Sequence, residues 1–394
     1  GDVGSGKTVV AGLAARQAVH AGFQAAFMAP TEILANQHAE TLSKILSPLG
    51  ITVGLLTGSV KGAARKLLYD QIATGSVDVV VGTHALIQTT VHFHKLGFVV
   101  IDEQHRFGVK QRQELLKKSR HMPHLLAMTA TPIPRSLALT VYGELDVSIL
   151  NELPKGRKAI ETKLWSPNSR AQLYTLIDEE IKQGRQGYVI CSLIDENPDN
   201  EVKSVQAEYK KLQNSIFKHR RIGLLHGKMK AEDKDHVMSQ FAAGKLDILV
   251  STTVVEVGVD VPNATVMLIE DADRFGLSQL HQLRGRVGRS VHQSFCYLVT
   301  SGSNAPSQRL KEIAKSNDGF YLAEVDLQLR GPGEIYGRAQ HGALNLQIAT
   351  LSDTKLISRA QKQAKLFVAS KENLLQYKKL SAQVEQYQRL TTLN

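Results

Sequence analysis

The first eight residues are Gly1-Asp2-Val3-Gly4-Ser5-Gly6-Lys7-Thr8. They match, at every position, the glycine-rich pattern of a phosphate-binding loop that opens a helix. Glycines let successive backbone N–H groups surround phosphate oxygens without Cβ clashes, Lys7 adds a positive charge, and Thr8 offers a hydroxyl to Mg²⁺. An ordinary glycine-rich turn does not explain a lysine and a threonine at the start of a helical pattern over residues 8–21. The octet therefore predicts a nucleotide site to which all eight residues contribute.

Short apolar runs and helical patterns alternate along most of the chain, which is typical of parallel α/β domains. A first set of predicted strands covers residues 25–29, 52–56, 77–81, 98–101 and 125–129. A second set covers residues 160–165, 187–191, 222–225, 248–251, 266–269 and 295–299. A charged segment with proline and glycine at residues 152–157 indicates a linker between the two sets. No internal repeat is evident.

The last part of the chain has only a helical pattern. Helices are predicted over residues 307–315 and 320–330, with a turn between them at Asn317-Asp318-Gly319 and a helical tail beyond. We predict α/β lobes at residues 1–152 and 158–302, and a C-terminal hairpin, loop and tail at residues 303–394. A phosphate loop normally follows a buried strand and none precedes Gly1, so we expect the sequence to be part of a longer chain.

The composition indicates a polyanionic partner. The formal net charge is +11, which suits nucleic acid, although a solvated basic surface would give the same excess. The two cysteines, Cys191 and Cys296, lie in strand-like runs and are expected to be buried free thiols rather than a disulfide or a metal site. No apolar stretch is long enough to cross a bilayer and no secretory signal is present, so we expect a cytoplasmic protein without a membrane partner.

A pair of carboxylates directly follows the predicted strand at residues 98–101. Asp102 and Glu103 therefore fall at the carboxyl edge of the sheet, where ligands of parallel sheets bind. Asp102 is placed to hold Mg²⁺ together with Thr8, and Glu103 to act as general base on the attacking water. A solvated acidic turn is the alternative, and the phosphate loop in the same sheet makes it the weaker one.

Five further stretches resemble, in order, the motifs of superfamily-two helicases. They are Ala29-Pro30-Thr31-Glu32, Gly82-Thr83-His84, Thr129-Ala130-Thr131-Pro132, the run from Ser251 through Thr252, Gly258 and Asp260 to Pro262, and the run from Gln282 to Arg289. The resemblance implies two tandem RecA-like parallel-sheet domains of the P-loop NTPase class that use ATP and Mg²⁺. It also implies that Gly258 and Asp260 bind nucleotide and that Gln282, Arg286 and Arg289 are catalytic.

The two arginines have a physical role in this resemblance. Phosphoryl transfer spreads negative charge over the γ-phosphate oxygens, and an arginine from another domain can stabilise that charge. Arg286 and Arg289 would come from the second lobe, so hydrolysis would require closed lobes and product release would reopen them. A phosphate-binding surface without catalysis is the weaker alternative.

A closer resemblance is to the RecG and Mfd families. It is carried by residues 102–109, 131–135 and 276–289, and Gln104 and Gly331-Pro332-Gly333-Glu334 favour RecG. The resemblance implies that residues 307–342 form a translocation hairpin and loop, in which Arg309, Arg330 and Gln340 transmit motion to duplex DNA. The glutamine motif and wedge domain of the family have no counterpart in this sequence.

The function implied is an ATP-dependent DNA translocase that drives fork reversal and Holliday-junction branch migration in recombination and repair. A bacterial, nucleoid-associated monomer is expected, with single-strand-binding protein as a further partner. Thr31, Thr83, Thr252 and Arg135 would contact backbone phosphates, and Thr129 and Thr131 would couple hydrolysis to that contact. Aromatic residues make up only 6% of the chain, so base stacking would contribute little.

Three alternatives remain open from the sequence. An Mfd-like transcription-repair coupling translocase shares most of these motifs. An RNA helicase is compatible with Asp102-Glu103-Gln104-His105, but the hairpin argues against it. A non-catalytic nucleic-acid clamp would not need Lys7, Glu103, Arg286 and Arg289, and all four are present.

Overall fold

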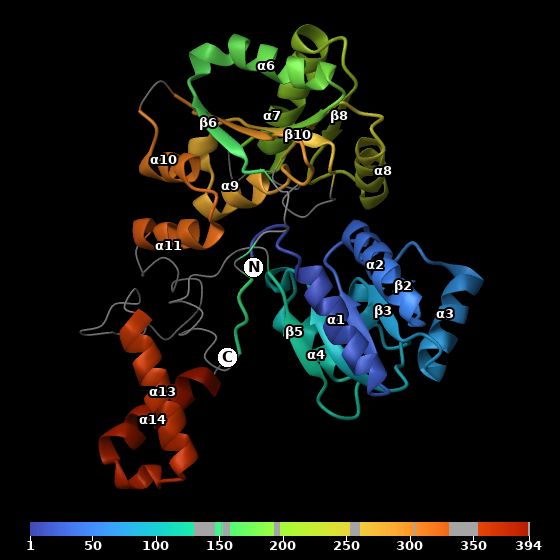
Figure 1. The fold of residues 1–394 in the computed structure, drawn as a ribbon, viewed down its shortest axis with the longest axis vertical. Helices are drawn as coiled ribbons and strands as arrows, with labels where there is room; N and C mark the ends of the chain where they lie inside the picture. Colours follow the sequence, from blue (N-terminus) through green and yellow to red (C-terminus); the bar gives the residue numbers. More distant parts are fainter. Residues whose placement is uncertain are drawn as a thin grey trace. The chain divides into compact units, whose positions relative to one another are not determined.

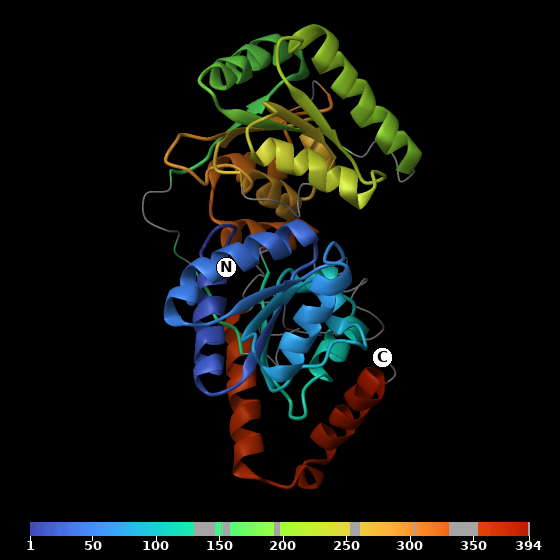
Figure 2. The ribbon, with the colours of Figure 1, turned by 90° about the vertical axis from the view of Figure 1, so that its right-hand side faces the viewer.

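The computed structural model describes residues 1–129, 146–150, 152, 158–192, 198–252, 261–302, 305–330 and 354–392. The chain divides into two compact units. The first consists of Gly1–Thr131 with Leu150–Asn317, and the second of Pro132–Ile149 with Asp318–Asn394. The first unit holds two parallel β-sheets, each with helices on both faces (Figures 1 and 2).

The first sheet has five parallel strands in the order β2-β3-β1-β4-β5. The strands are β1 Gln24–Met28, β2 Val53–Leu56, β3 Val79–Gly82, β4 Leu96–Ile101 and β5 His124–Ala127. The helices are α1 Lys7–His20, α2 Glu32–Leu46, α3 Gly62–Thr74 and α4 Val109–Leu116. The short 3₁₀ turns of this lobe are η1 Ser47–Leu49, η2 His84–Ile87 and η3 Gln104–Arg106.

Strand β1 is buried on both faces because helices cover both sides of the sheet. Ala25 and Phe27 pack in a core with side chains of α1 and α2. Ala26 and Met28 point the other way and pack with α3 and α4. This alternation explains why the strand reads as a continuous apolar run.

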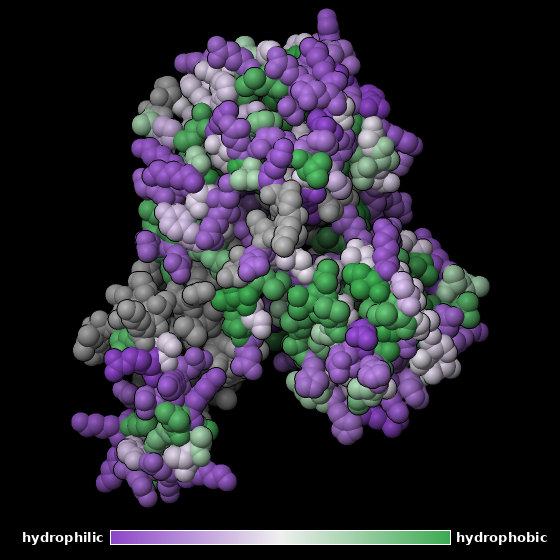
Figure 3. Space-filling view, viewed as in Figure 1, coloured by the Kyte–Doolittle hydropathy of each residue, from purple (hydrophilic) through white to green (hydrophobic). Residues whose placement is uncertain are grey.

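Helix α1 meets the core through small residues and keeps larger ones outside. Ala11 and Ala15 are buried, whereas Leu13 is 54% exposed and Val9 and Val10 are exposed as well. These outward side chains belong to the hydrophobic area, green in Figure 3, that lies over α1. Gly12 allows α2 to approach, because a Cβ there would lie 3.0 Å from Leu42 Cδ2.

The second sheet has six parallel strands in the order β6-β11-β10-β7-β9-β8. The strands are β6 Glu161–Trp165, β7 Gln186–Ile190, β8 Ile222–Leu225, β9 Ile248–Ser251, β10 Ala264–Ile269 and β11 Phe295–Val299. The helical segments are η4 Pro167–Ser169, α6 Arg170–Lys182, α7 Pro198–Lys211, the π-turn η5 Leu212–Ile216, α8 Ala231–Ala242, η7 Ala272–Arg274 and α9 Leu277–Arg284. The two parallel sheets confirm the predicted α/β class.

The second core explains the state of both cysteines. Cys191 packs with α6 and α7 on one face of the sheet, and Cys296 is fully buried in β11. Both are free thiols, as predicted. Burial raises the pKa of Cys296 to about 12, because the apolar surroundings disfavour a thiolate.

The C-terminal helices are α10 Gln308–Lys315 in the first unit, and α11 Gly319–Arg330, α13 Thr354–Ser370 and α14 Lys378–Thr392 in the second, with the 3₁₀ turn η8 Leu374–Gln376. The first two confirm the predicted helices to within a residue. In the tail, the rings of Phe367 and Tyr377 lie 5.3 Å apart, edge to face. No helix in the described parts of the chain is long and apolar enough to span a membrane.

The two sheets repeat one design, which sequence inspection missed. The order β2-β3-β1-β4-β5 recurs as β8-β9-β7-β10-β11, and β6 is added beside β11. A buried glutamine begins each central strand. The Gln24 amide donates to the carbonyls of Ile72 and Val77, and the Gln186 amide donates to those of Phe241 and Leu246. The repeat is one of backbone arrangement, and few identical residues mark it.

The same local structure follows β4 and β10. Each strand is followed by an acidic pair whose second member is left-handed, at φ 48° for Glu103 and 50° for Asp271. A 3₁₀ turn then leads to a glycine whose N–H donates to a glutamine side chain in the next helix, over 3.1 Å in one lobe and 3.2 Å in the other. The shared sequence Arg-Phe-Gly, at residues 106–108 and 274–276, marks the correspondence.

Candidate active site

The phosphate loop is shaped by glycines in the left-handed region. Gly4 has φ 72° and Gly6, the N-cap of α1, has φ 90°. Lys7 Nζ donates to the carbonyl oxygens of Gly1 and Asp2, over 2.8 Å and 2.7 Å. The first turn of α1 has no acidic residue, so no side chain of that turn offsets its positive end.

The loop fits an anionic ligand on two further observations. The Ser5 hydroxyl is buried and has no hydrogen-bond partner among the described residues. A Cβ built at Gly6 meets no described residue within 4 Å, so the described part of the chain leaves space beside this end of α1. Burial lowers the pKa of Lys7, while the carboxylates of Glu103 and Asp102 raise it. The lysine and the two carboxylates therefore share one electrostatic environment.

Asp102 is held by bonds to both of its carboxylate oxygens. Oδ1 accepts the N–H of Glu103 at 3.0 Å, and Oδ2 lies 2.8 Å from Nε2 of His38. The carboxylate is buried at the C-terminal end of β4. Glu103 follows in the left-handed conformation, which is strained for a residue with a Cβ. Its Oε2 lies 3.7 Å from Nδ1 of His105.

His38 is a site residue that sequence reasoning missed. It lies on α2 and its ring packs at 4.6 Å against Phe27 of β1. The available signal was its position, because it shares the buried face of α2 with Ala35, Ala39 and Leu42. A histidine on such a face needs a polar partner, but the sequence does not say which one.

The catalytic arginines predicted in the second lobe share the environment of the first-lobe carboxylates. Arg286 is buried just after α9, and burial lowers its pKa to about 10. Arg289 lowers that pKa too, whereas Glu103 and Asp102 raise it. Arg289 also lowers the pKa of Lys7 and donates from Nε to the Gly285 carbonyl at 3.2 Å. A guanidinium with a pKa near 10 stays charged at neutral pH.

Direct contacts join the phosphate loop to α9. His281 Nε2 lies 2.6 Å from Asp2 Oδ1, and a Cβ built on Gly285 would lie only 2.7 Å from Val3 Cβ. Gln282, the third predicted catalytic residue of this motif, is also buried on α9. His281 and Arg284 were quoted in the motif without an assigned role, and both proved to be buried in the first unit.

The chain is similar to known helicases along most of its length. Three family models match in succession: DEAD/DEAH box helicase over residues 1–140, helicase conserved C-terminal domain over 169–291, and ATP-dependent DNA helicase RecG, domain 3, C-terminal over 316–391. The ATP-dependent DNA helicase RecG of Synechocystis sp. is 51% identical over 393 residues, which is 99% of this chain and 47% of that protein. The chain belongs to the RecG family.

Further RecG proteins support this assignment. The RecG of Bacillus subtilis is 50% identical over 94% of this chain and 54% of that protein. A solved structure of RecG bound to a three-way DNA junction matches with a TM-score of 0.74 and 45% identity, over 90% of this chain and 46% of that one. The chain thus spans about half the length of the curated relatives it matches. The relatives named here agree with the RecG alternative that Gln104 and residues 331–334 favoured.

The threonines expected to grip DNA occupy repeated positions in this RecG-family fold. Thr83 follows β3 and Thr252 follows β9, and each backbone N–H donates to the last residue of the neighbouring strand, Leu56 or Leu225. Both hydroxyls are buried, and neither has a hydrogen-bond partner within the described parts of the chain. Their contact with phosphate stays a prediction.

The structure describes some of the remaining residues predicted to contact DNA or nucleotide, and others lie outside the described residues. The Thr31 hydroxyl caps α2 by accepting the Leu34 N–H at 3.3 Å, and Thr8, Thr129 and Arg309 are half-buried. Arg330 ends α11, but its side chain lies outside the description. Five predicted residues also lie outside the described part of the chain: Thr131, Arg135, Gly258, Asp260 and Gln340.

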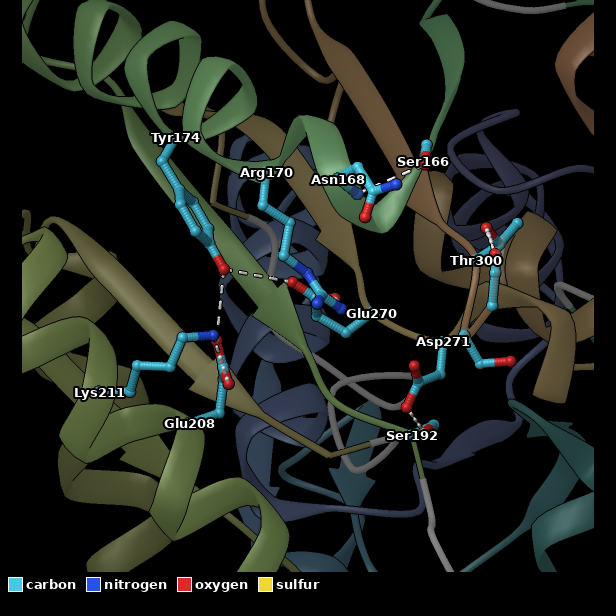
Figure 4. A network of polar contacts seen from close by, with 12 residues as sticks. Ser166, Asn168, Arg170, Tyr174, Ser192, Glu208, Lys211, Glu270, Asp271 and Thr300 are labelled. Atoms are coloured by element: carbon cyan, nitrogen blue, oxygen red, sulfur yellow. Dashed lines mark hydrogen bonds and ion pairs between the residues drawn. The ribbon is translucent and has the colours of Figure 1, made fainter. Parts of the chain in front are cut away.

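Glu270 and Asp271 of the second lobe correspond to Asp102 and Glu103, and side chains of the protein form hydrogen bonds with both (Figure 4). Glu270 Oε2 accepts from Arg170 at 2.7 Å, and Tyr174 donates to Glu270 Oε1 at 3.4 Å. Asp271 Oδ2 accepts from the Ser192 hydroxyl at 2.9 Å. Burial raises the pKa of Glu270, and Arg170 lowers it. Side chains of the same lobe therefore supply hydrogen-bond donors to both members of this acidic pair.

Proposed function

We propose that this chain is the ATP-driven motor of a RecG-family DNA helicase. It would hydrolyse ATP and use the energy to move on double-stranded DNA, reversing forks and branch-migrating Holliday junctions in recombination and repair. One observation carries the proposal: the carboxylate of Glu103, at the end of the first sheet, raises the pKa of both Lys7 in the phosphate loop and Arg286 in the second lobe.

The proposed reaction divides the work among these groups. The loop N–H groups and Lys7 bind the phosphates of ATP. Glu103 accepts a proton from water as the water oxygen bonds to the γ-phosphorus and the bond to the ADP oxygen breaks. Arg286 and Arg289, supported by Gln282, stabilise the charge that spreads over the phosphoryl oxygens. Gly258 and Asp260 would complete the nucleotide contacts.

Thr8 and Asp102 would hold Mg²⁺, which neutralises phosphate charge when bound. No cluster of three or more acidic, histidine or cysteine side chains that could hold a metal by itself occurs among the described residues. A hydroxyl and one carboxylate suit Mg²⁺, which keeps several waters and shares phosphate oxygens with its nucleotide. The donor set therefore fits a cation that arrives with ATP.

The proposed DNA contacts use the phosphate backbone. Thr31, Thr83, Thr252 and Arg135 would grip it, and Thr129 and Thr131 would couple the grip to hydrolysis. Arg309, Arg330 and Gln340 would pass the motion to duplex DNA. The net charge of +11 supports a polyanionic partner, and a relative solved on a three-way junction supports branched DNA. Monomeric action at the bacterial nucleoid, beside single-strand-binding protein, completes the proposal.

The decisive experiment measures ATP hydrolysis by the full-length protein with and without a three-way junction. We expect strong stimulation by junction DNA, and loss of turnover in Lys7→Ala. Equal rates with and without DNA would argue against a DNA motor. A protein that binds the junction but never hydrolyses ATP would be a clamp instead.

A further inference from the structure

A continuous series of hydrogen bonds leads from the phosphate loop to the end of α10. His281 Nε2 lies 2.6 Å from Asp2 Oδ1, and Arg284 Nη2 lies 2.9 Å from His281 Nδ1. Arg284 Nη1 then donates to the carbonyls of Ile313 and Ser316, over 2.7 Å and 2.9 Å. Arg284 is 2% exposed and His281 is 5% exposed, so water competes little for these bonds.

The donors and acceptors of this series fix the protonation of His281. A guanidinium can only donate, so Nδ1 of His281 must accept from Arg284 and carries no proton. The proton of a neutral imidazole then lies on Nε2, which donates to the Asp2 carboxylate. Each member therefore orients the next, from Arg284 to His281 to Asp2.

One end of the series lies at the phosphate loop and the other at the C-terminal end of α10. At one end, the Asp2 backbone carbonyl accepts from Nζ of Lys7 at 2.7 Å, and Lys7 is the residue proposed to bind phosphate. At the other end, Ile313 lies in the last turn of α10, where carbonyls lack partners within the helix. Arg284 supplies those carbonyls with a cationic donor, the charge that favours a helix C-terminus.

We propose that Asp2, His281 and Arg284 form a relay that reports phosphate binding at Lys7 to the C-terminal end of α10. His281 and Arg284 are positioning residues in this relay, and neither touches the reacting atoms. The proposal rests on the proposed function, because it assigns the relay to the coupling of ATP hydrolysis with DNA movement. Phosphate draws Lys7 away from Asp2, Asp2 shifts against His281, and the change passes through Arg284 to α10.

The test uses the full-length protein and four variants. His281→Phe keeps a ring but removes both hydrogen bonds, and His281→Gln keeps an amide donor for Asp2. Arg284→Lys keeps a charge but can bond fewer partners. His236→Gln is the matched control, because His236 is an exposed histidine on α8. Thermal unfolding identifies any variant that fails to fold, and His281→Gln replaces His281→Phe in that case.

The first readout is the number of base pairs unwound per ATP on a three-way junction. We expect His281→Phe to keep DNA-independent hydrolysis and to lose at least about tenfold in base pairs per ATP, as the loss of a charge-assisted bond predicts. His281→Gln should recover part of that loss, and His236→Gln should match the natural protein. Unchanged coupling in folded His281→Phe and Arg284→Lys would overturn the relay.

The second readout is hydrogen exchange at residues 313–317, with and without a non-hydrolysable ATP analogue and with no DNA. We expect the analogue to change exchange there in the natural protein and not in His281→Phe. No response in the natural protein would overturn the relay. This arm needs nucleotide binding alone, so it remains decisive if the protein binds ATP but proves not to be a DNA motor.

Discussion

His38 Nε2 and Asp102 Oδ2 lie 2.8 Å apart in a buried contact between α2 and the end of β4. An ionised carboxylate only accepts hydrogen bonds, so His38 is the donor. The bond fixes the rotation of the carboxylate that is proposed to hold Mg²⁺. The same pairing of a ligand with a supporting side chain tunes many metal sites.

Removing this support should weaken Mg²⁺ use. We expect His38→Ala to raise the Mg²⁺ concentration that gives half-maximal ATP hydrolysis by about 10- to 100-fold, the usual effect of losing such a partner. His38→Gln retains a hydrogen-bond donor, so its half-saturating Mg²⁺ concentration should lie between those of the natural protein and His38→Ala. A Mg²⁺ titration of the hydrolysis rate checks this, and an unchanged half-saturation point in His38→Ala would contradict the supporting role.

Glu103 and Asp271 have the same left-handed backbone conformation in the two lobes, so Asp271 is a matched control for testing Glu103 as the general base. Glu103→Gln should lower kcat for ATP hydrolysis by about 10²- to 10⁴-fold and leave the KM for ATP nearly unchanged, because it removes proton transfer and not binding. Asp271→Asn changes the equivalent position in the second lobe and should leave kcat intact. Steady-state kinetics of both variants decide the matter. If kcat fell by a comparable factor in both variants, Glu103 would support the structure of the site and would not act as the general base.

Gly285 allows α9 to approach the phosphate loop. Its φ of −66° suits alanine, so the obstacle to Gly285→Ala is steric: the new Cβ would lie 2.7 Å from Val3 Cβ. We expect the loop to shift and the KM for ATP to rise, with a cost of about 1–3 kcal/mol for the overpacking. Gly302→Ala is the control, because no described residue lies within 4 Å of a Cβ built there. If Gly285→Ala and Gly302→Ala had the same KM for ATP, the contact between Gly285 and Val3 would not influence nucleotide binding.

A surface cluster in the second lobe should make stability depend on pH. Hydrogen bonds from Arg220, with Lys182 and His219, hold the pKa of Asp178 below its ordinary value of 3.8. A depressed pKa stabilises the fold above the ordinary value, and the stabilisation is lost as pH falls through the folded-state value. Asp178→Asn should therefore lower the Tm at neutral pH, and the difference should shrink in acid. Melting curves from pH 7 down to about pH 3 test the sign.

Many of the strands and helices were predicted correctly from local patterns of apolar and polar residues. The strand predicted at residues 248–251 is β9, and that at 295–299 is β11, because both are apolar runs closed by polar residues. The strand predicted at 77–81 became Val79–Gly82, since a run of valines does not mark its own ends. The order of strands within each sheet was not predicted.

Some features of the candidate site were also predicted from the sequence, and others were found only in the structure. The roles of Lys7, Asp102, Glu103 and Arg286 were proposed from short motifs, and these residues do share one environment. His38 was missed because its partner is 64 residues away, and the buried state of Thr83 and Thr252 was not foreseen. A motif records which groups are present, whereas burial depends on everything packed around them.

By itself, the sequence of this chain determined the phosphate loop, the α/β class, the position of most strands and helices, and the family resemblance. These follow from neighbouring residues, through hydrophobic periodicity, glycine conformation and spacing along one segment. Only the tertiary structure decided that Asp2 meets His281 across 279 residues and that Glu103 and Asp271 repeat one backbone turn. Such contacts arise when whole elements pack, because burial forces polar groups to find partners wherever the fold brings them.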